Sequence, residues 1–246
     1  MTSNLKDQYK KNGYFVLRNL FDEKILENAY QEILKSNKVI KYYDKKKQIR
    51  RIEKIYNKGK NLRKINKLIL IKLQKILNKE FTIFKDKLNT KPKGGEGFYP
   101  HYDGVFEFKD NKNNIWPGWY KYTSYFVNVL VAIDKCGKKN GSIEIAPIHK
   151  GGFKKLLNNT KKDGTPDLKK NINDKLKYKT MLLNAGDEVV FSNACPHKSK
   201  KNNSLRNRRT IYYTYSLKKN GSFYNLYFKD KKYSANKTSK SLSGEI

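Results

Sequence analysis

The sequence predicts a mainly β domain, an antiparallel sandwich or barrel with flanking helices. Three observations support this fold class. The second half of the chain holds short β-rich runs, such as YFVNVLVAI and RRTIYYTYSL, separated by Gly, Asn and Asp turns. No long helical pattern lies between these runs, whereas two segments of the first half have apolar residues at helical spacing. The 246 residues, 37% of them hydrophobic, are enough to bury one core.

The first 90 residues are predicted to contain one strand and two helices. GYFVLRNLF (13–21) is a β-rich run, and Asp22 directly after it is a suitable N-cap for a helix over 23–36. Leu and Ile recur on one face of 61–77, which predicts a second helix whose apolar stripe packs on the core rather than on a partner. We therefore expect residues 1–90 to form a helical support.

After Thr90 the texture of the sequence changes. Several Pro and Gly residues break the chain near 92–100, and β-rich runs dominate beyond them. The core strands are expected in 123–134, 141–147, 179–193 and 208–217. We expect one domain in three parts: the helical support, a core over 91–228 that includes a polar surface excursion at 151–179, and a tail over 229–246, either loose or folded over the site.

The chain is strongly basic, with 55 Lys and Arg against 22 Asp and Glu and a net charge of +33. Such a charge suits nucleic acid, an anionic membrane or an anionic small substrate. The lysines are scattered and no nucleic-acid motif accompanies them, and Lys and Asn share A-rich codons, so a composition bias explains the charge better. No feature of the sequence indicates an oligomeric state.

The compartment is predicted from three features of the sequence. The two cysteines are too few for a disulfide framework. The N-terminus lacks the apolar region of a secretory signal, and no apolar run approaches the roughly 20 residues that span a bilayer. We therefore expect a soluble cytoplasmic protein that does not contact membranes.

A metal-binding pattern lies in FYPHYDGVF. In a strand, residues i and i+2 point to the same face, so His101 and Asp103 are expected to lie together while Tyr102 points away. A distant His197, after the strand-like run LLNAGDEVVFSN, would complete a set of two histidines and one carboxylate. This set leaves coordination positions open on Fe(II) for a cosubstrate and O2. The chain has only three histidines, so the occurrence of two of them in this pattern favours a metal site over chance.

Two residues after His197 fit a bound dicarboxylate. Ser199 lies two positions later and Arg208 eleven positions later (208 − 197 = 11). A buried guanidinium on a strand can bind a carboxylate bidentately, and a nearby hydroxyl can add a second donor. Strand alternation would place Arg208 inward and Arg209 outward.

Four stretches resemble the phytanoyl-CoA dioxygenase-like (PhyH) family of Fe(II)/2-oxoglutarate oxygenases. They are NGYFVLRNLFDEKILENAYQEI, PHYDG, KKNGSIEIAPIHKGG and NAGDEVVFSNACPHKSKKNNSLRNRRTIYYTY. The resemblance implies a double-stranded β-helix (jelly-roll) core with an N-terminal helical layer. It also implies Fe(II), 2-oxoglutarate and O2 as cofactor and cosubstrates. The iron ligands would be His101, Asp103 and His197, and Arg208 and Ser199 would bind 2-oxoglutarate.

Two departures from the family pattern bear on the substrate. Tyr102 replaces the Gln that the family often has, and PIHK replaces its PGSH before His149. A CoA thioester is therefore not the expected substrate. Asp103 is present, whereas related halogenases lack this carboxylate, so hydroxylation is the expected reaction.

Substrate contacts are predicted from aromatic residues near the ligand pair. The candidates are Tyr102, Phe106, Trp116, Trp119 and Tyr120, most of them on a loop that either covers the pocket or packs on the core rim. Asn128, the one polar residue of YFVNVLVAI, needs a hydrogen-bond partner if it faces inward, and 2-oxoglutarate is a candidate.

The expected function is hydroxylation of a C–H bond in a small polar molecule. The Lys-rich surroundings allow an anionic substrate, and organophosphonates and amino-acid derivatives are candidates by resemblance. Two alternatives stay open: a nucleic-acid dealkylating oxygenase, and an inactive jelly roll that only binds.

Overall fold

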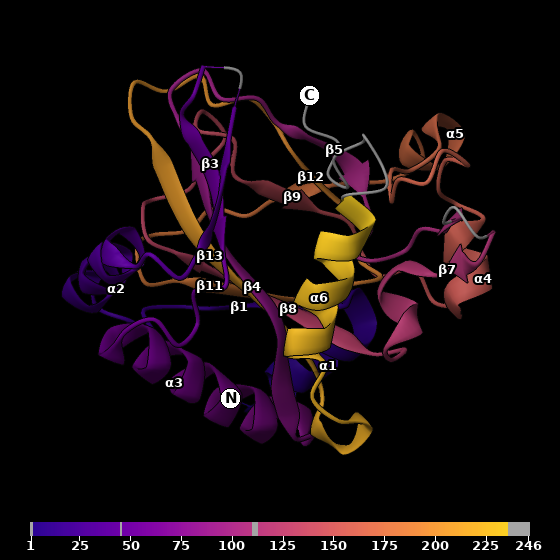
Figure 1. The fold of residues 1–246 in the computed structure, drawn as a ribbon, viewed down its shortest axis with the longest axis horizontal. Coiled ribbons are helices and arrows are strands. Elements are labelled where there is room, and N and C mark those ends of the chain that lie inside the picture. The colour runs from indigo at the N-terminus through magenta and orange to yellow at the C-terminus, as the bar shows by residue number, and fades with distance from the viewer. Residues whose placement is uncertain (1, 45, 110–112, 236–246) are drawn as a thin grey trace.

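Two antiparallel sheets form the core of the protein. The computed structural model describes residues 2–44, 46–109 and 113–235 (Figure 1). A seven-stranded sheet has the order β1-β11-β8-β13-β4-β3-β2, a four-stranded sheet has the order β10-β9-β12-β5, and β6 and β7 form a separate hairpin. This is the predicted antiparallel fold class.

The strands are β1 (Tyr14–Leu17), β2 (Ile40–Tyr43), β3 (Ile49–Glu53), β4 (Phe81–Lys91), β5 (Phe98–His101), β6 (Phe108–Lys109), β7 (Ile115–Trp116), β8 (Phe126–Ala132), β9 (Ile143–Ile145), β10 (Lys179–Thr180), β11 (Glu188–Ser192), β12 (His197–Ser199) and β13 (Arg208–Leu217). The α-helices are α1 (Thr2–Asn12), α2 (Glu23–Lys35), α3 (Lys60–Leu77), α4 (Phe153–Leu157), α5 (Lys170–Asn173) and α6 (Tyr224–Ala235). None of the helices in the described ranges is long and apolar enough to cross a membrane.

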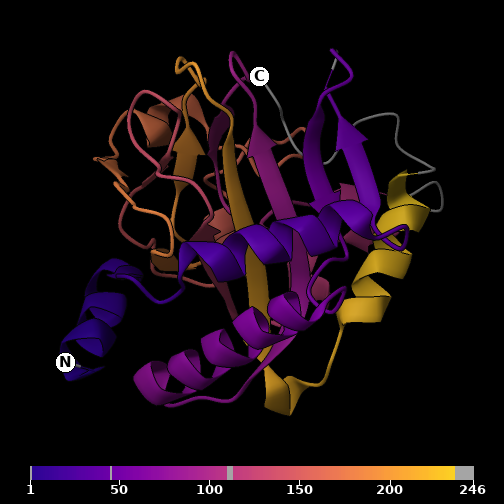
Figure 2. The ribbon, with the colours of Figure 1, turned by 90° about the vertical axis from the view of Figure 1, so that its left-hand side faces the viewer.

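Helices α2 and α3 cover one face of the seven-stranded sheet (Figure 2). Asp22 caps α2 as predicted, because its Oδ1 accepts a hydrogen bond from the backbone N–H of Ile25 (2.8 Å). On α3 the buried residues recur at helical spacing, from Leu62 through Ile69 to Leu77. Both helices are confirmed within a residue of their expected ends.

Period-two alternation separates the two faces of the large sheet. On β8, Val127, Val129 and Val131 pack in the cluster under the helices, whereas Leu130 and Ala132 pack toward the four-stranded sheet. Asn128 lies on the same inner face as Leu130. The inner face is therefore the surface on which a site between the sheets is built.

The expected division at residue 90 is wrong. The first 90 residues supply helices, but they also supply β1, β2, β3 and nearly all of β4, which lies between β13 and β3 in the large sheet. Strand β4 was missed because KDKLNTK reads as a polar segment. Its Lys85, Lys87 and Asn89 share the inner face, where they border a polar site instead of an apolar core.

The regions expected to be irregular contain some helix. The polar excursion holds the short helices α4 and α5. Helix α6 begins at Tyr224 and continues to Ala235, so the first part of the expected tail is helical. It packs beside β4, and its Lys231 Nζ pairs with Glu53 Oε1 of the neighbouring β3 at 2.7 Å. Residues 236–246 of the expected tail lie outside the described residues.

Candidate metal and cosubstrate site

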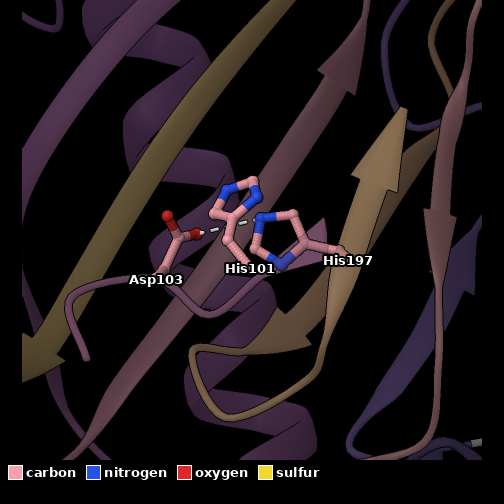
Figure 3. A group of neighbouring side chains, drawn as sticks. All are labelled: His101, Asp103 and His197. Carbon is pink, nitrogen blue, oxygen red and sulfur yellow. Dashed lines mark ion pairs between the residues drawn. The ribbon is translucent and has the colours of Figure 1, made fainter. Parts of the chain in front are cut away.

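Two paired strands bring the two histidines together. Strands β5 and β12 are antiparallel, with His101 directly opposite His197. The imidazole centroids are 4.2 Å apart. Asp103 follows β5 by two residues, and one ligand atom each of His101, Asp103 and His197 lies within 4.8 Å of the others (Figure 3). The spacing predicted from the sequence is thus realised as one compact donor set.

Backbone carbonyls orient both imidazoles. The Nδ1–H of His101 donates to the carbonyl of Tyr99 (2.6 Å), and that of His197 donates to the carbonyl of Cys195 (3.0 Å). A carbonyl can only accept, so each Nδ1 carries the proton and each Nε2 keeps a free lone pair. Such carbonyl contacts are typical of metal-binding histidines.

The protonation states suit a cation. Burial and the neighbouring His101 lower the pKa of His197 to about 4, so its imidazole is neutral at pH 7. Burial by itself would raise the pKa of Asp103, but attraction by His197, Lys87 and His101 lowers it overall. The site therefore offers the neutral imidazole of His197 and a carboxylate, with His197 Nε2 3.6 Å from Asp103 Oδ2.

A hydrogen-bonded chain on the inner face holds Asp103. Asn128 Nδ2 donates to Asp103 Oδ2 (2.9 Å), and Thr214 Oγ1 donates to Asn128 Oδ1 (2.8 Å). Asn128 and Thr214 are direct neighbours on β8 and β13. The inward amide thus has partners, and one of its N–H groups remains for a ligand. That Asn128 contacts 2-oxoglutarate stays a prediction.

Arg208 lies inward and has N–H donors that no described residue accepts. It is the first residue of β13, is 3% exposed, and its Nε and Nη1 atoms are buried without a hydrogen-bond partner among the described residues. Arg209 lies on the opposite face, where it binds Asp134 and Glu27. The predicted alternation of the two arginines is confirmed.

A second basic group lies beside Arg208. Lys91 of β4 pairs with Arg208 across the sheet, and its Nζ donates to Ser199 Oγ (2.8 Å). Burial lowers the pKa of Lys91 to about 6, and repulsion by Arg208 and Arg50 adds to this shift. An anion that bound among these groups would relieve that repulsion.

Comparison with known proteins gives the family. Residues 9–210 match the phytanoyl-CoA dioxygenase (PhyH) family. The chain belongs to the phytanoyl-CoA dioxygenase family. It is an Fe(II)- and 2-oxoglutarate-dependent dioxygenase, as the sequence predicted.

Two curated proteins are similar to this chain. The 2-aminoethylphosphonate dioxygenase of the uncultured bacterium HF130_AEPn_1 is 26% identical, over 94% of this chain and 87% of the relative. The methylphosphonate hydroxylase of Gimesia maris is 28% identical, over 64% of this chain and 54% of the relative.

Solved structures show the same fold. EctD from S. alaskensis, a structure determined with 2-oxoglutarate and 5-hydroxyectoine, has a TM-score of 0.66 and 16% identity, covering 89% of this chain and 77% of EctD. The epimerase SnoN, in complex with Fe3+, alpha ketoglutarate and nogalamycin RO, has a TM-score of 0.66 and 15% identity, covering 87% of this chain and 82% of SnoN. The predicted jelly-roll fold is confirmed.

The residues of this dioxygenase fit both partners that the family requires. Two imidazoles and a carboxylate form the donor set typical of non-haem Fe(II). The unpartnered N–H groups of Arg208 are suitable donors for a carboxylate.

The five aromatic residues predicted for the substrate pocket lie in different places. Trp119 lines an inner-face pocket with Asp103 and Asn128. Phe106 and Trp116 both stack on Phe108. Tyr120 OH accepts a hydrogen bond from Asn193 Nδ2 (3.3 Å), beside the backbone of Asp103.

Tyr102 lies in a different environment from the other four. Its side chain is fully buried in a cluster with Val105 and Leu156, and its hydroxyl contacts His149 and Asn159. Tyr102 therefore points away from the donor set, as strand alternation predicts.

Sequence reasoning missed the inward lysines of β4. Lys85 and Lys87 line the same pocket as Asp103, and Lys91 contacts Ser199. The sequence carried little signal, because KDKLNTK is polar on both faces of the strand apart from Leu88. The abundance of Lys throughout the chain weakened it further.

Proposed function

We propose that His101, Asp103 and His197 hold the Fe(II) ion of this dioxygenase. We also propose that the enzyme hydroxylates a C–H bond of a small organophosphonate. The observation that carries the iron assignment is the convergence of three ligand atoms within 4.8 Å, with both Nδ1 atoms already bound to carbonyls. The phosphonate class is supported by the relative that matches 94% of the chain.

Arg208 is the proposed anchor of 2-oxoglutarate. The unpartnered Nε and Nη1 of its buried guanidinium would bind the distal carboxylate, and Ser199 would add a hydroxyl. When bound, iron and 2-oxoglutarate supply the oxidation of substrate by O2, in which 2-oxoglutarate yields succinate and CO2 and the substrate gains a hydroxyl group. Asn128 and Thr214 keep the Asp103 carboxylate in place throughout.

The basic pocket and the donor set bear on the alternatives. A set of two histidines, a carboxylate and a buried arginine favours an active enzyme over an inactive binding module. The pocket is lined by eight residues of the inner face and its rim, and a pocket of this size suits a small molecule better than a nucleic acid. Both cysteines are free and buried, in keeping with the cytoplasmic location that the sequence predicts.

The decisive experiment is an anaerobic titration with Fe(II) and 2-oxoglutarate, followed by visible absorption. Chelation predicts a weak charge-transfer band near ~500 nm that Asp103→Ala abolishes and Arg208→Met weakens. Methylphosphonate and 2-aminoethylphosphonate are then screened for succinate release coupled to product. A folded protein without the band would refute the iron assignment, and a band without phosphonate turnover would refute the substrate class.

A further inference from the structure

Two lysines of β4 point into the pocket beside the iron ligands. Lys85 and Lys87 are two residues apart on one strand and therefore share a face. Both line the pocket together with Asp103, Asn128, Trp119 and Tyr212. This brings two ammonium groups to the inner face next to a proposed iron ligand.

Sheet register connects Lys85 to the donor set. Lys85 lies opposite Thr214 of β13, and Thr214 lies opposite Asn128 of β8. Asn128 in turn donates to Asp103. One row across three strands thus runs from Lys85 to Asn128, which contacts the donor set, and a ligand held by Lys85 would lie along this row.

Neither ammonium group has an anionic partner in the described part of the chain. Lys85 Nζ lies 4.9 Å from the ring centroid of Trp119 and 5.3 Å from that of Tyr227, and Lys87 Nζ lies 4.9 Å from that of Tyr212. Neither side chain makes an ion pair or hydrogen bond with a described residue. Aromatic faces compensate only part of the hydration that a buried ammonium loses.

The neighbouring buried carboxylate already has its own cation. Both oxygens of Glu53 accept from Lys231 Nζ, at 2.7 and 2.5 Å, and Tyr42 OH adds a third contact (3.1 Å). Glu53 is therefore committed to holding α6 on β3. Burial lowers the pKa of Lys85 and of Lys87, and attraction by Glu53 and Asp103 offsets only part of this shift.

The lysine pair and Arg208 are separated along the inner face. Arg208 pairs with Lys91, whereas Lys85 pairs with Thr214, six residues further along β13. Six residues of extended strand span about 20 Å. A five-carbon dicarboxylate anchored on Arg208 is much shorter than this, so the Lys85 end is available for a different anion.

We propose that Lys85 and Lys87 form an oxyanion subsite that binds the phosphonate group of the substrate and so presents its carbon to the iron. The inference rests on the proposed function for the identity of the anion. A phosphonate has three oxygens and up to two negative charges, which suits two ammonium donors in a partly desolvated pocket. Lys85 and Lys87 would thereby select for an anionic head group.

The test measures anion binding directly. The protein loaded with Fe(II) and 2-oxoglutarate is titrated anaerobically with inorganic phosphate and with 2-aminoethylphosphonate in a calorimeter. Lys85→Met and Lys87→Met keep side-chain length and remove the charge. Lys41→Met is the matched control, because Lys41 is an exposed lysine on β2 of the same sheet.

We expect each inward variant to raise the dissociation constant of both anions at least tenfold, and Lys41→Met to leave it within twofold. The charge-transfer band should show that the affinity for 2-oxoglutarate stays within twofold. Unchanged anion binding in the inward variants, or no phosphate binding by the wild type, would overturn the subsite. So would a selective loss of 2-oxoglutarate binding.

A second measurement uses only the wild type, so it does not depend on how the variants fold. Phosphate should slow the acetylation of Lys85 and Lys87, read by mass spectrometry, and leave Lys41 unchanged; equal protection of all three would contradict the proposal.

The experiments distinguish failure of the subsite from failure of the proposed function. Lysine-dependent phosphate binding without phosphonate oxidation would remove the proposed substrate and keep the subsite. Phosphonate oxidation with an unchanged KM in the inward variants would do the reverse.

Discussion

His197 Nε2 lies 3.6 Å from Asp103 Oδ2, although 94 residues separate the two in the chain (197 − 103 = 94). The contact forms because β12 pairs with β5 and brings His197 opposite His101. A cation bound between these side chains would replace the contact with metal–ligand bonds. The arrangement leads to a set of predictions about the metal, the cosubstrate and the surrounding fold.

His197→Gln should abolish stoichiometric Fe(II) binding and hydroxylation, because it removes one of three ligands. The matched control is His149→Gln. His149 is the third histidine of the chain, and its Nδ1 contacts Tyr102 OH instead of the donor set. Iron content after anaerobic loading and gel filtration distinguishes the two variants. Equal iron loss in both would contradict the assignment of ligands.

Arg208→Met should raise the dissociation constant of 2-oxoglutarate at least 30-fold, because loss of a buried charge pair costs about 2 kcal/mol or more. Arg206→Met, on the exposed turn before β13, is the control and should bind normally. Titration of the charge-transfer band gives both constants. Normal affinity in Arg208→Met would show that the cosubstrate lies elsewhere.

Thr214→Val should weaken Fe(II) binding about tenfold, since changes around metal ligands typically cost 10–100-fold in affinity. The variant removes the hydroxyl that donates to Asn128, which in turn holds Asp103. Thr214→Ser keeps the hydroxyl and should restore the wild-type affinity. If Ser and Val behave alike, the packing of the methyl group rather than the hydrogen bond is responsible.

Glu188→Gln should stabilise the protein at neutral pH and much less in acid. Glu188 is 1% exposed, its Oε1 has no partner among the described residues, and burial raises its pKa to about 8. With the folded pKa above the unfolded one, its stability contribution is complete below about pH 4.5 and is lost as pH rises through 8. The expected gain at pH 7 is about 3 kcal/mol.

Urea unfolding of the metal-free protein at pH 5 and pH 8 tests this prediction. The advantage of Glu188→Gln over the wild type should grow with pH. Glu80→Gln, a change at an exposed carboxylate beside Lys218, should show no such trend. The same offset at both pH values would indicate that Glu188 is not protonated in the folded state.

Tyr102→Phe should lower stability by about 1–3 kcal/mol and leave the KM for substrate within twofold. The variant leaves His149 and Asn159 without the hydroxyl that they contact in a buried cluster. Thermal unfolding and steady-state kinetics separate the two effects. A large rise in KM with unchanged stability would return Tyr102 to the substrate pocket.

The sequence by itself determined the His101–Asp103 pair, the fold class and the two long N-terminal helices. His101 and Asp103 lie two residues apart, and strand geometry places such residues on one face wherever the strand is. Helix α3 followed from its apolar spacing, and α2 from its cap and stripe. These are local patterns, and local geometry is sufficient to interpret them.

Only the tertiary structure decided which partners these patterns meet. From its sequence, β4 looks like a charged segment. In the structure it lies between β13 and β3, and its inner face lines the pocket. Helix α6 depends in the same way on the pairing of Lys231 with Glu53, 178 residues away. Strands are recognised by an apolar inner face that packs on a core. Where the inner face lines a ligand site instead, charged residues replace the apolar ones and the pattern is lost.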